Sequence, residues 1–243
     1  MRFVALFSAL LLALSARSGI IYSPVNPVNG SIPDGSAVGW AGTATASGYL
    51  PSITAVTVNL NISGGYNGDL YAYLSYSSGN QSVLVPLLNR VGVKSGDAFG
   101  YGDTGFSIML SSAAANDVHS YGDFTPSFNE NGQLTGTWKP DGRAISPLSA
   151  PSAFDSASRV SFASYNGMNP NGTWTLFLAD LSSGAQSQLV NWELGITGVP
   201  EPVNVALSVF ASLFLVVTGV RSKWARNRFH QWRVAFSRWV NAV

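Results

Sequence analysis

The clearest alternation of apolar and polar residues lies between Asn169 and Ile196. Its apolar positions are Trp174, Leu176 and Leu178 and, after a break at 180–187, Val190, Trp192, Leu194 and Ile196. A period of two predicts a strand with one buried face, so the segment predicts two strands joined as a β-hairpin. Because an isolated hairpin is only marginally stable in water, a second sheet must cover the two tryptophan faces.

The same period recurs through the rest of the central chain and predicts an all-β fold. Three segments separated by short polar turns predict an antiparallel meander: Ile53–Ile62, Leu70–Tyr76 and Ser82–Leu88. Further strands are predicted at Phe106–Leu110, Val118–Tyr121 and Val160–Tyr165. Irregular edge strands and turns are expected over Ile20–Pro51, and an extended connection over Phe124–Pro151. The total of about eight strands, with no helical spacing between them, favours an antiparallel β-sandwich of the jelly-roll type.

Both ends of the chain depart from this pattern. Residues 1–18 have one arginine near the start, a short apolar run and small residues, which is the layout of a secretory signal peptide. Residues 203–220 contain no charge and are rich in Val, Ala, Leu and Phe. A helix of this length is about 27 Å long, close to the roughly 30 Å of a bilayer core. These features predict a β-domain over 19–198 followed by one transmembrane helix.

Charge is distributed unevenly along the 243 residues, although the formal net charge is only +1. Between Gly19 and Pro200 there are five basic and eleven acidic residues, whereas six basic and no acidic residues follow Gly219. An acidic body argues against nucleic acid as a partner, because phosphate binding needs clustered Lys and Arg. The chain has no cysteine, so disulfides and Cys-ligated zinc are excluded.

Two short motifs resemble the P domain, the jelly-roll module attached to proprotein convertases and to many bacterial secreted proteins. The closing strands of that domain are similar to three segments here: Gly172-Thr-Trp-Thr-Leu176, Ala179-Asp180 and Leu189-Val-Asn-Trp-Glu-Leu194. An earlier motif of the domain, in which a strand leads into Gly-Asp-Leu, is similar to Gly68-Asp69-Leu70. The resemblance covers roughly 53–196. It implies a non-catalytic module, since the convertases keep their catalytic machinery in a separate domain, and it implies a calcium ion near Gly68-Asp69-Leu70.

The C-terminal region, 199–228, resembles the PEP-CTERM sorting signal of bacterial exported proteins. Its motif is Val199, Pro200, Glu201 and Pro202, followed by the apolar helix at 203–220 and a basic cluster formed by Arg221, Lys223, Arg226 and Arg228. Positive flanks stay in the cytoplasm, so the β-domain is expected outside. The resemblance implies an exosortase-type processing enzyme as partner. Unlike most such signals, the chain continues through 229–243, which predicts a basic amphipathic helix on the inner membrane surface.

Candidate catalytic residues are few. The two histidines, His119 and His230, lie far apart in the sequence, and no Gly-x-Ser-x-Gly motif accompanies His119. We therefore expect His119 to be a solvated loop residue. Glu130 and Glu193 are the only glutamates in the body, and neither has an evident acid/base partner. The sequence predicts that the protein is not an enzyme.

Two candidate binding sites remain. Asp69, Asp97, Asp103 and Asp180 fall in turns or at strand ends, where carboxylates and backbone carbonyls can bind Ca²⁺; alternatively, these aspartates cap turns with their own backbone. Tyr71 and Tyr73 are expected on the outward face of a strand and could form a platform for sugar rings, but cross-strand pairing is the preferred explanation for them.

Together these features predict an exported, non-catalytic β-sandwich with a structural or adhesive role. It is expected to pass through an inner-membrane-anchored intermediate to the cell surface or extracellular matrix. The alternative is a calcium-assisted carbohydrate-binding module for extracellular polysaccharide, with calcium as the one cofactor left open.

Overall fold

The computed structural model describes residues 18–22, 28–47, 52–199, 209–215 and 218–219. The chain divides into two compact units, one formed by Ala16–Val199 and one by Met1–Ser15 with Pro200–Val243. The first unit, called the β unit below, contains all the described strands. The fold is therefore all-β, as the alternation of apolar residues predicts.

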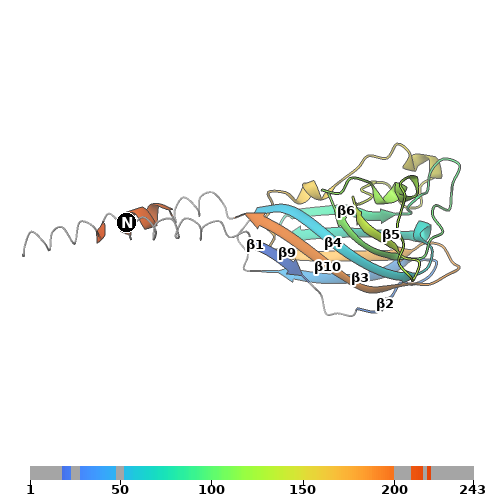
Figure 1. Ribbon diagram of the computed structural model, residues 1–243, viewed down its shortest axis with the longest axis horizontal. Coiled ribbons are helices and arrows are strands. Elements are labelled where there is room, and N and C mark those ends of the chain that lie inside the picture. The colour runs from blue at the N-terminus through green and yellow to red at the C-terminus, as the bar shows by residue number, and fades with distance from the viewer. Residues whose placement is uncertain (1–17, 23–27, 48–51, 200–208, 216–217, 220–243) are drawn as a thin grey trace, which may run out of the picture. The chain divides into compact units, whose positions relative to one another are not determined.

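The described strands form two sheets (Figure 1). The six-stranded sheet has the order β1-β10-β4-β7-β8, with β2 also paired to β10, and the four-stranded sheet has the order β3-β9-β5-β6. Their bounds are β1 (Ser18–Tyr22), β2 (Gly30–Ser31), β3 (Ser36–Ala46), β4 (Ser52–Gly64), β5 (Leu70–Ser78), β6 (Gln81–Asn89), β7 (Phe106–Ser111), β8 (Leu134–Trp138), β9 (Gly172–Asp180) and β10 (Ser187–Val199). Strand pairs are antiparallel except β7 with β8, which are parallel.

The predicted closing hairpin is wrong in its pairing, although both of its strands exist. β9 pairs with β3 and β5 in the four-stranded sheet, whereas β10 pairs with β1, β2 and β4 in the other. Residues 181–186 therefore connect one sheet to the other. Alternation shows which side chains face the core, but it does not distinguish a neighbouring strand from one in the opposite sheet. Trp174 and Trp192 are both fully buried, as predicted.

The predicted meander is wrong for the same reason. β4 and β5 belong to different sheets, and only β5 and β6 form a hairpin. The segments predicted as strands at Val118–Tyr121 and Val160–Tyr165 instead contain 3₁₀ helices, η2 (Val118–Asp123) and η4 (Phe162–Tyr165). The edge strands expected over Ile20–Pro51 include β3, which has 11 residues and lies at the edge of the four-stranded sheet. The extended connection expected over Phe124–Pro151 contains a strand, β8.

The core fills the space between the two sheets with apolar and aromatic side chains. Trp174 packs against Tyr76 and Tyr165, with ring centroids 4.6 and 5.1 Å away. The Tyr165 hydroxyl donates a hydrogen bond of 2.7 Å to the carbonyl oxygen of Leu74. Burial of each large apolar side chain contributes roughly 1.5–3 kcal/mol, so this cluster fixes β5, β9 and η4 against one another.

In the second unit, residues 209–215 and 218–219 are helical. Within the described residues, no helix is both long enough and apolar enough to cross a bilayer. Residues 1–17 of the predicted signal peptide lie outside the described residues, and its last residue, Ser18, begins β1. Pro200 to Pro202, the basic cluster, the amphipathic tail and much of the predicted helix at 203–220 also lie outside them.

Candidate functional site

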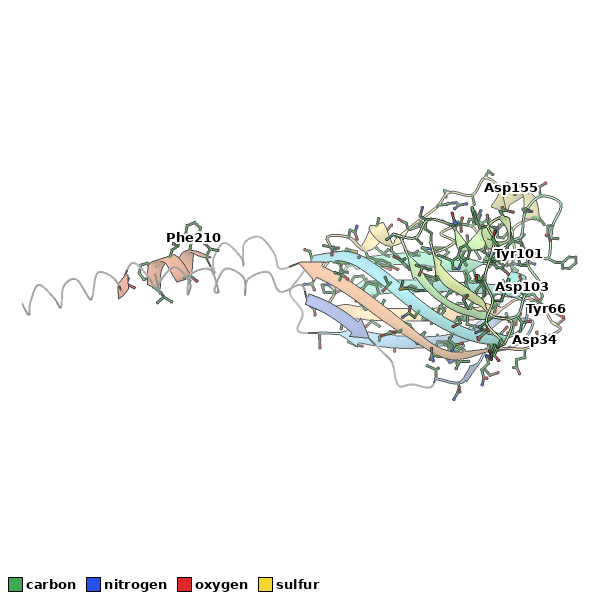
Figure 2. The ribbon with its side chains drawn as sticks, viewed as in Figure 1. Asp34, Tyr66, Tyr101, Asp103, Asp155 and Phe210 are labelled. Carbon is green, nitrogen blue, oxygen red and sulfur yellow. The ribbon has the colours of Figure 1, made fainter. Side chains whose placement is uncertain are left out.

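The predicted calcium ligands Asp69 and Asp180 lie together at one end of the β unit. Asp69 ends η1 (Asn67–Asp69), and Asp180 is the last residue of β9, where it pairs with Leu70. Asp34, from the turn before β3, lies at the same end (Figure 2). Its carboxylate accepts a hydrogen bond of 3.2 Å from the backbone N–H of Gly184. We call Asp34, Asp69 and Asp180 the acidic cluster.

Asp180 is the buried member of the acidic cluster and has no exposed surface. Its Oδ2 accepts a hydrogen bond of 2.9 Å from the Ser187 hydroxyl, whereas its Oδ1 is buried without a hydrogen-bond partner. Burial raises the pKa of Asp180 to about 6, and the nearby negative charges of Asp69 and Asp34 add to the shift. This carboxyl therefore favours a proton or a cation beside it.

The pKa of Asp69 is also raised. Burial raises its pKa, while a hydrogen bond from the Ser182 side chain and the charge of Arg90 oppose the shift. Asp34 lies close enough to raise the pKa further. The sequence analysis missed Asp34, because only the fold brings the turn before β3 to the ends of β5 and β9.

Asp97 and Asp103 lie in the loop after β6, and their carboxylates accept hydrogen bonds from groups outside the acidic cluster. Asp97 Oδ1 accepts hydrogen bonds from the backbone N–H groups of Phe99 and Gly100, at 3.2 and 2.9 Å, so it caps its own turn. Asp103 Oδ2 accepts a hydrogen bond of 2.7 Å from the Tyr121 hydroxyl.

The four predicted ligands therefore do not form a single shell. Within the part of the chain that the structure describes, no three histidine or carboxylate side chains are grouped to hold a metal ion. Calcium also accepts backbone carbonyl and amide oxygens, and Asn67 Oδ1, in η1 beside Asp69, is a second buried oxygen without a partner. A calcium site stays a prediction.

His119 is not a solvated loop residue, because only 3% of it is exposed. Its Nδ1 lies 2.6 Å from Asp141 Oδ2, and its Nε2 lies 2.9 Å from the carbonyl oxygen of Val93. Asp141 Oδ1 in turn lies 3.2 Å from a terminal nitrogen of Arg143. In a Ser-His-Asp hydrolase the Nε2 atom accepts the serine proton. Here the Nε2 atom of His119 faces the carbonyl oxygen of Val93 instead of a serine hydroxyl. His119, Asp141 and Arg143 therefore form a buried hydrogen-bonded network.

A cavity of about 200 Å³ opens beside this network. It is lined by Gly92, Lys94, Tyr101, His119, Ser120, Asp123, Arg143 and Asp155. The Arg143 guanidinium is held by Asp117, Asp141 and the carbonyl oxygen of Phe154. Its charge is therefore already compensated.

Tyr71 and Tyr73 lie on the outward face of the four-stranded sheet, as expected, and their role as a sugar platform stays a prediction. Tyr71 and Tyr73 have ring centroids 5.9 Å apart, and Phe177 of β9 stacks on Tyr73 at 4.9 Å with an interplanar angle of 16°. Because Phe177 is opposite Tyr73 in the β5–β9 register, cross-strand pairing extends the platform to a third ring. Sequence reasoning missed Phe177 because it placed β9 in another pairing.

Of the predicted sorting motif, the structure describes only the backbone of Val199, the last residue of β10. Pro200, Glu201 and Pro202 lie beyond the described part of that segment, as do Arg221, Lys223, Arg226 and Arg228. Their roles stay predictions.

No family model matches the chain. No curated protein matches it either. Among solved structures, the serine protease of Aeromonas sobria in complex with its chaperone is 16% identical, with a TM-score of 0.41 over 79% of this chain and 29% of that one. The same protease alone is 15% identical, with a TM-score of 0.40 over 80% and 30% of the two chains. The chain thus spans less than a third of the length of these proteins.

Proposed function

We propose that this chain is an exported, non-catalytic β-sandwich protein with a structural or adhesive role at the cell surface or in the extracellular matrix. The observation that carries the proposal is the order of three features after the β unit: Val199-Pro-Glu-Pro202, the uncharged segment at 203–220 and the cluster of basic residues after it. The order of these three features resembles the PEP-CTERM signal.

The proposal includes a finer architecture. The β unit is a jelly-roll-type sandwich similar to a P domain, and 203–220 is a helix that crosses the inner membrane during sorting. The basic cluster keeps the C-terminus in the cytoplasm, so the β unit lies outside. An exosortase-type enzyme then acts near Pro200 to Pro202 and releases the protein to the surface or matrix.

The experiment that tests this compares the mass and location of the protein in cells with the native sequence and with Pro200-Glu201-Pro202 replaced by three alanines. We expect the native protein to be released or surface-bound, with a mature mass that ends near Val199 to Pro202, and the variant to stay in the inner membrane. The matched control is Pro33→Ala, which replaces a proline between β2 and β3, far from the sorting motif in the sequence. If native protein and variant both keep the tail and stay in the membrane, the sorting proposal is wrong.

A second candidate function is carbohydrate binding assisted by calcium. The stacked rings of Tyr73 and Phe177, with Tyr71 beside them, favour it because they present aromatic surface to solvent on a sheet face. The acidic cluster favours a role for calcium in holding the loops at one end of the β unit. An adhesive protein and a polysaccharide-binding module are compatible, since binding to matrix polysaccharide is one form of adhesion.

A further inference from the structure

The outward side chains of the four-stranded sheet form three rows that cross the strands in register. From β3 through β9 and β5 to β6 the rows are Ala41-Phe177-Tyr73, Thr43-Thr175-Ser75-Leu84 and Thr45-Thr173-Ser77-Ser82, while Pro86, which is in register with Tyr73, is buried. We call these rows, together with Tyr71, the outer face. Residues between them along each strand, such as Leu74, Trp174 and Leu176, are buried in the core. The outer face thus combines three aromatic rings with two rows of hydroxyl groups.

No residue of the outer face carries a charge. The eleven acidic residues between Gly19 and Pro200 therefore all lie elsewhere. The outward face of the other sheet does carry a charge, since Glu193 accepts a hydrogen bond of 3.0 Å from the Asn59 side chain there. Burial raises the pKa of Tyr71, so its phenol also stays neutral at physiological pH. A face of this kind complements an uncharged ligand.

The aromatic rings are held in place before any ligand binds. Phe177 packs over Gly39, which adopts a φ of +63°, and a Cβ at position 39 would overlap both the ring and the carbonyl oxygen of Leu178. Stacking between Tyr73 and Phe177 fixes the second ring. Side chains that are already ordered lose little conformational entropy on binding, which favours affinity.

The rows of Thr and Ser hydroxyl groups indicate which of two ligands the outer face would bind, a second copy of this chain or a neutral polysaccharide. A second copy of this chain would bury the hydroxyls of Thr43, Thr175 and Ser75 against side chains of the same kind, and buried polar groups that are poorly paired oppose association. A neutral polysaccharide offers both apolar C–H surface and many hydroxyl groups that can donate and accept. Its chemistry therefore matches the rings and the hydroxyl rows together.

We propose that the outer face binds an extended, uncharged polysaccharide chain, with sugar rings packed on Tyr71, Tyr73 and Phe177 and sugar hydroxyls hydrogen-bonded to the Thr and Ser rows. This rests on the proposed function, which places the β unit where such polymers occur, and it names the ligand class. Calcium at the acidic cluster is not required for this binding.

The test uses the full chain in mild detergent and measures retardation in gels that contain a soluble neutral β-glucan or, for comparison, the anionic polymer alginate. Tyr73→Ala removes a ring, and Thr175→Asp places a charge at the centre of the hydroxyl rows without entering the core. Met109→Ala is the matched control, because Met109 is 38% exposed and lies in β7 of the other sheet. Thermal unfolding of each variant verifies that it is folded.

We expect binding of β-glucan that is insensitive to salt, about tenfold weaker in both outer-face variants and unchanged in Met109→Ala. Absence of β-glucan binding by the wild type, or equal binding by folded outer-face variants, would falsify the proposal. Salt-sensitive binding of alginate alone, or a dimer that dissociates on Thr175→Asp, would overturn it too, because the occupant would then be an anionic polymer or a second copy. The export experiment is independent of these results, so the two proposals can fail separately.

Discussion

At the scale of single residues, Asp180 is a carboxyl group whose ionisation is strongly affected by the fold. Its folded-state pKa of about 6 lies above the unfolded value of 3.8, because burial disfavours the charged form. A group with a raised pKa stabilises the folded state below the unfolded pKa, and this contribution is lost as the pH rises through the folded pKa. The affected window therefore extends from about pH 4 to about pH 6.

We predict that the difference in unfolding free energy between wild type and Asp180→Asn depends on pH. On going from about pH 4 to about pH 7, the wild type should lose about 2–3 kcal/mol relative to the variant, because only the wild type must keep a charged group buried there. Urea unfolding at both pH values gives this difference. Asp155→Asn is the control, since Asp155 is exposed. A difference that does not change with pH would show that Asp180 ionises without cost.

The same variant tests the calcium prediction. If calcium binds the acidic cluster in the folded protein alone, excess calcium should raise the unfolding temperature of the wild type at neutral pH. Asp180→Asn should remove most of this shift because it removes a ligand charge. An equal shift in wild type and variant would place any calcium away from Asp180.

At the scale of elements, β3 shows how one glycine shapes a sheet face. The register between β3 and β9 shifts between Ser36 and Trp40, and Gly39 lies within this irregularity. Its positive φ and the close approach of Phe177 both require a residue without Cβ. The sequence showed only a Gly-rich segment here and predicted irregular edge structure.

We predict that Gly39→Ala destabilises the protein by about 1–3 kcal/mol, because it adds backbone strain and displaces the Phe177 ring. Gly79→Ala is the matched control. Gly79 also has a positive φ, of 55°, but a Cβ there would meet nothing within 4 Å. Chemical denaturation of both variants separates strain from steric overlap. If both variants lose the same unfolding free energy, the overlap of a Cβ at position 39 with Phe177 and the Leu178 carbonyl oxygen contributes nothing.

Strand pairing is where prediction at this scale failed. β4 and β9 were recognised from their alternation, and their inward residues Val58, Leu60, Leu176 and Leu178 are buried as expected. Their predicted partners in sequence lie in the opposite sheet, because short connections in a sandwich can cross between sheets as well as form hairpins. β8 was missed because Thr135, Gly136 and Thr137 give it no apolar alternation.

At the scale of the whole molecule, the hydrophobic core that the described residues form lies in the β unit. The buried cluster begins at Ile32 and ends at Ile196, and the last strand ends at Val199. A unit with its own core is expected to fold independently of the C-terminal segment.

We predict that a chain truncated after Pro202 keeps the cooperative urea unfolding transition of the full chain, with the same midpoint within error. The physical reason is that none of the described core residues lies beyond Ile196. Truncation after Leu189, which removes Trp192 and Leu194 from β10, is the matched control and should abolish the transition. Loss of folding in the longer truncation would show that the β unit depends on the C-terminal segment.

Local sequence patterns were sufficient to indicate which side chains face the core, where charge is scarce, and that an apolar segment followed by basic residues comes after the β-rich region. A period of two or a run of apolar residues is visible within a single segment, so these properties can be read without the fold. The neighbours of each strand could not be read in this way, nor could the grouping of Asp34 with Asp69 and Asp180, the stacking of Phe177 on Tyr73 or the burial of His119. Each of these depends on contacts between segments far apart in sequence, which packing between the two sheets selects and which no single segment encodes.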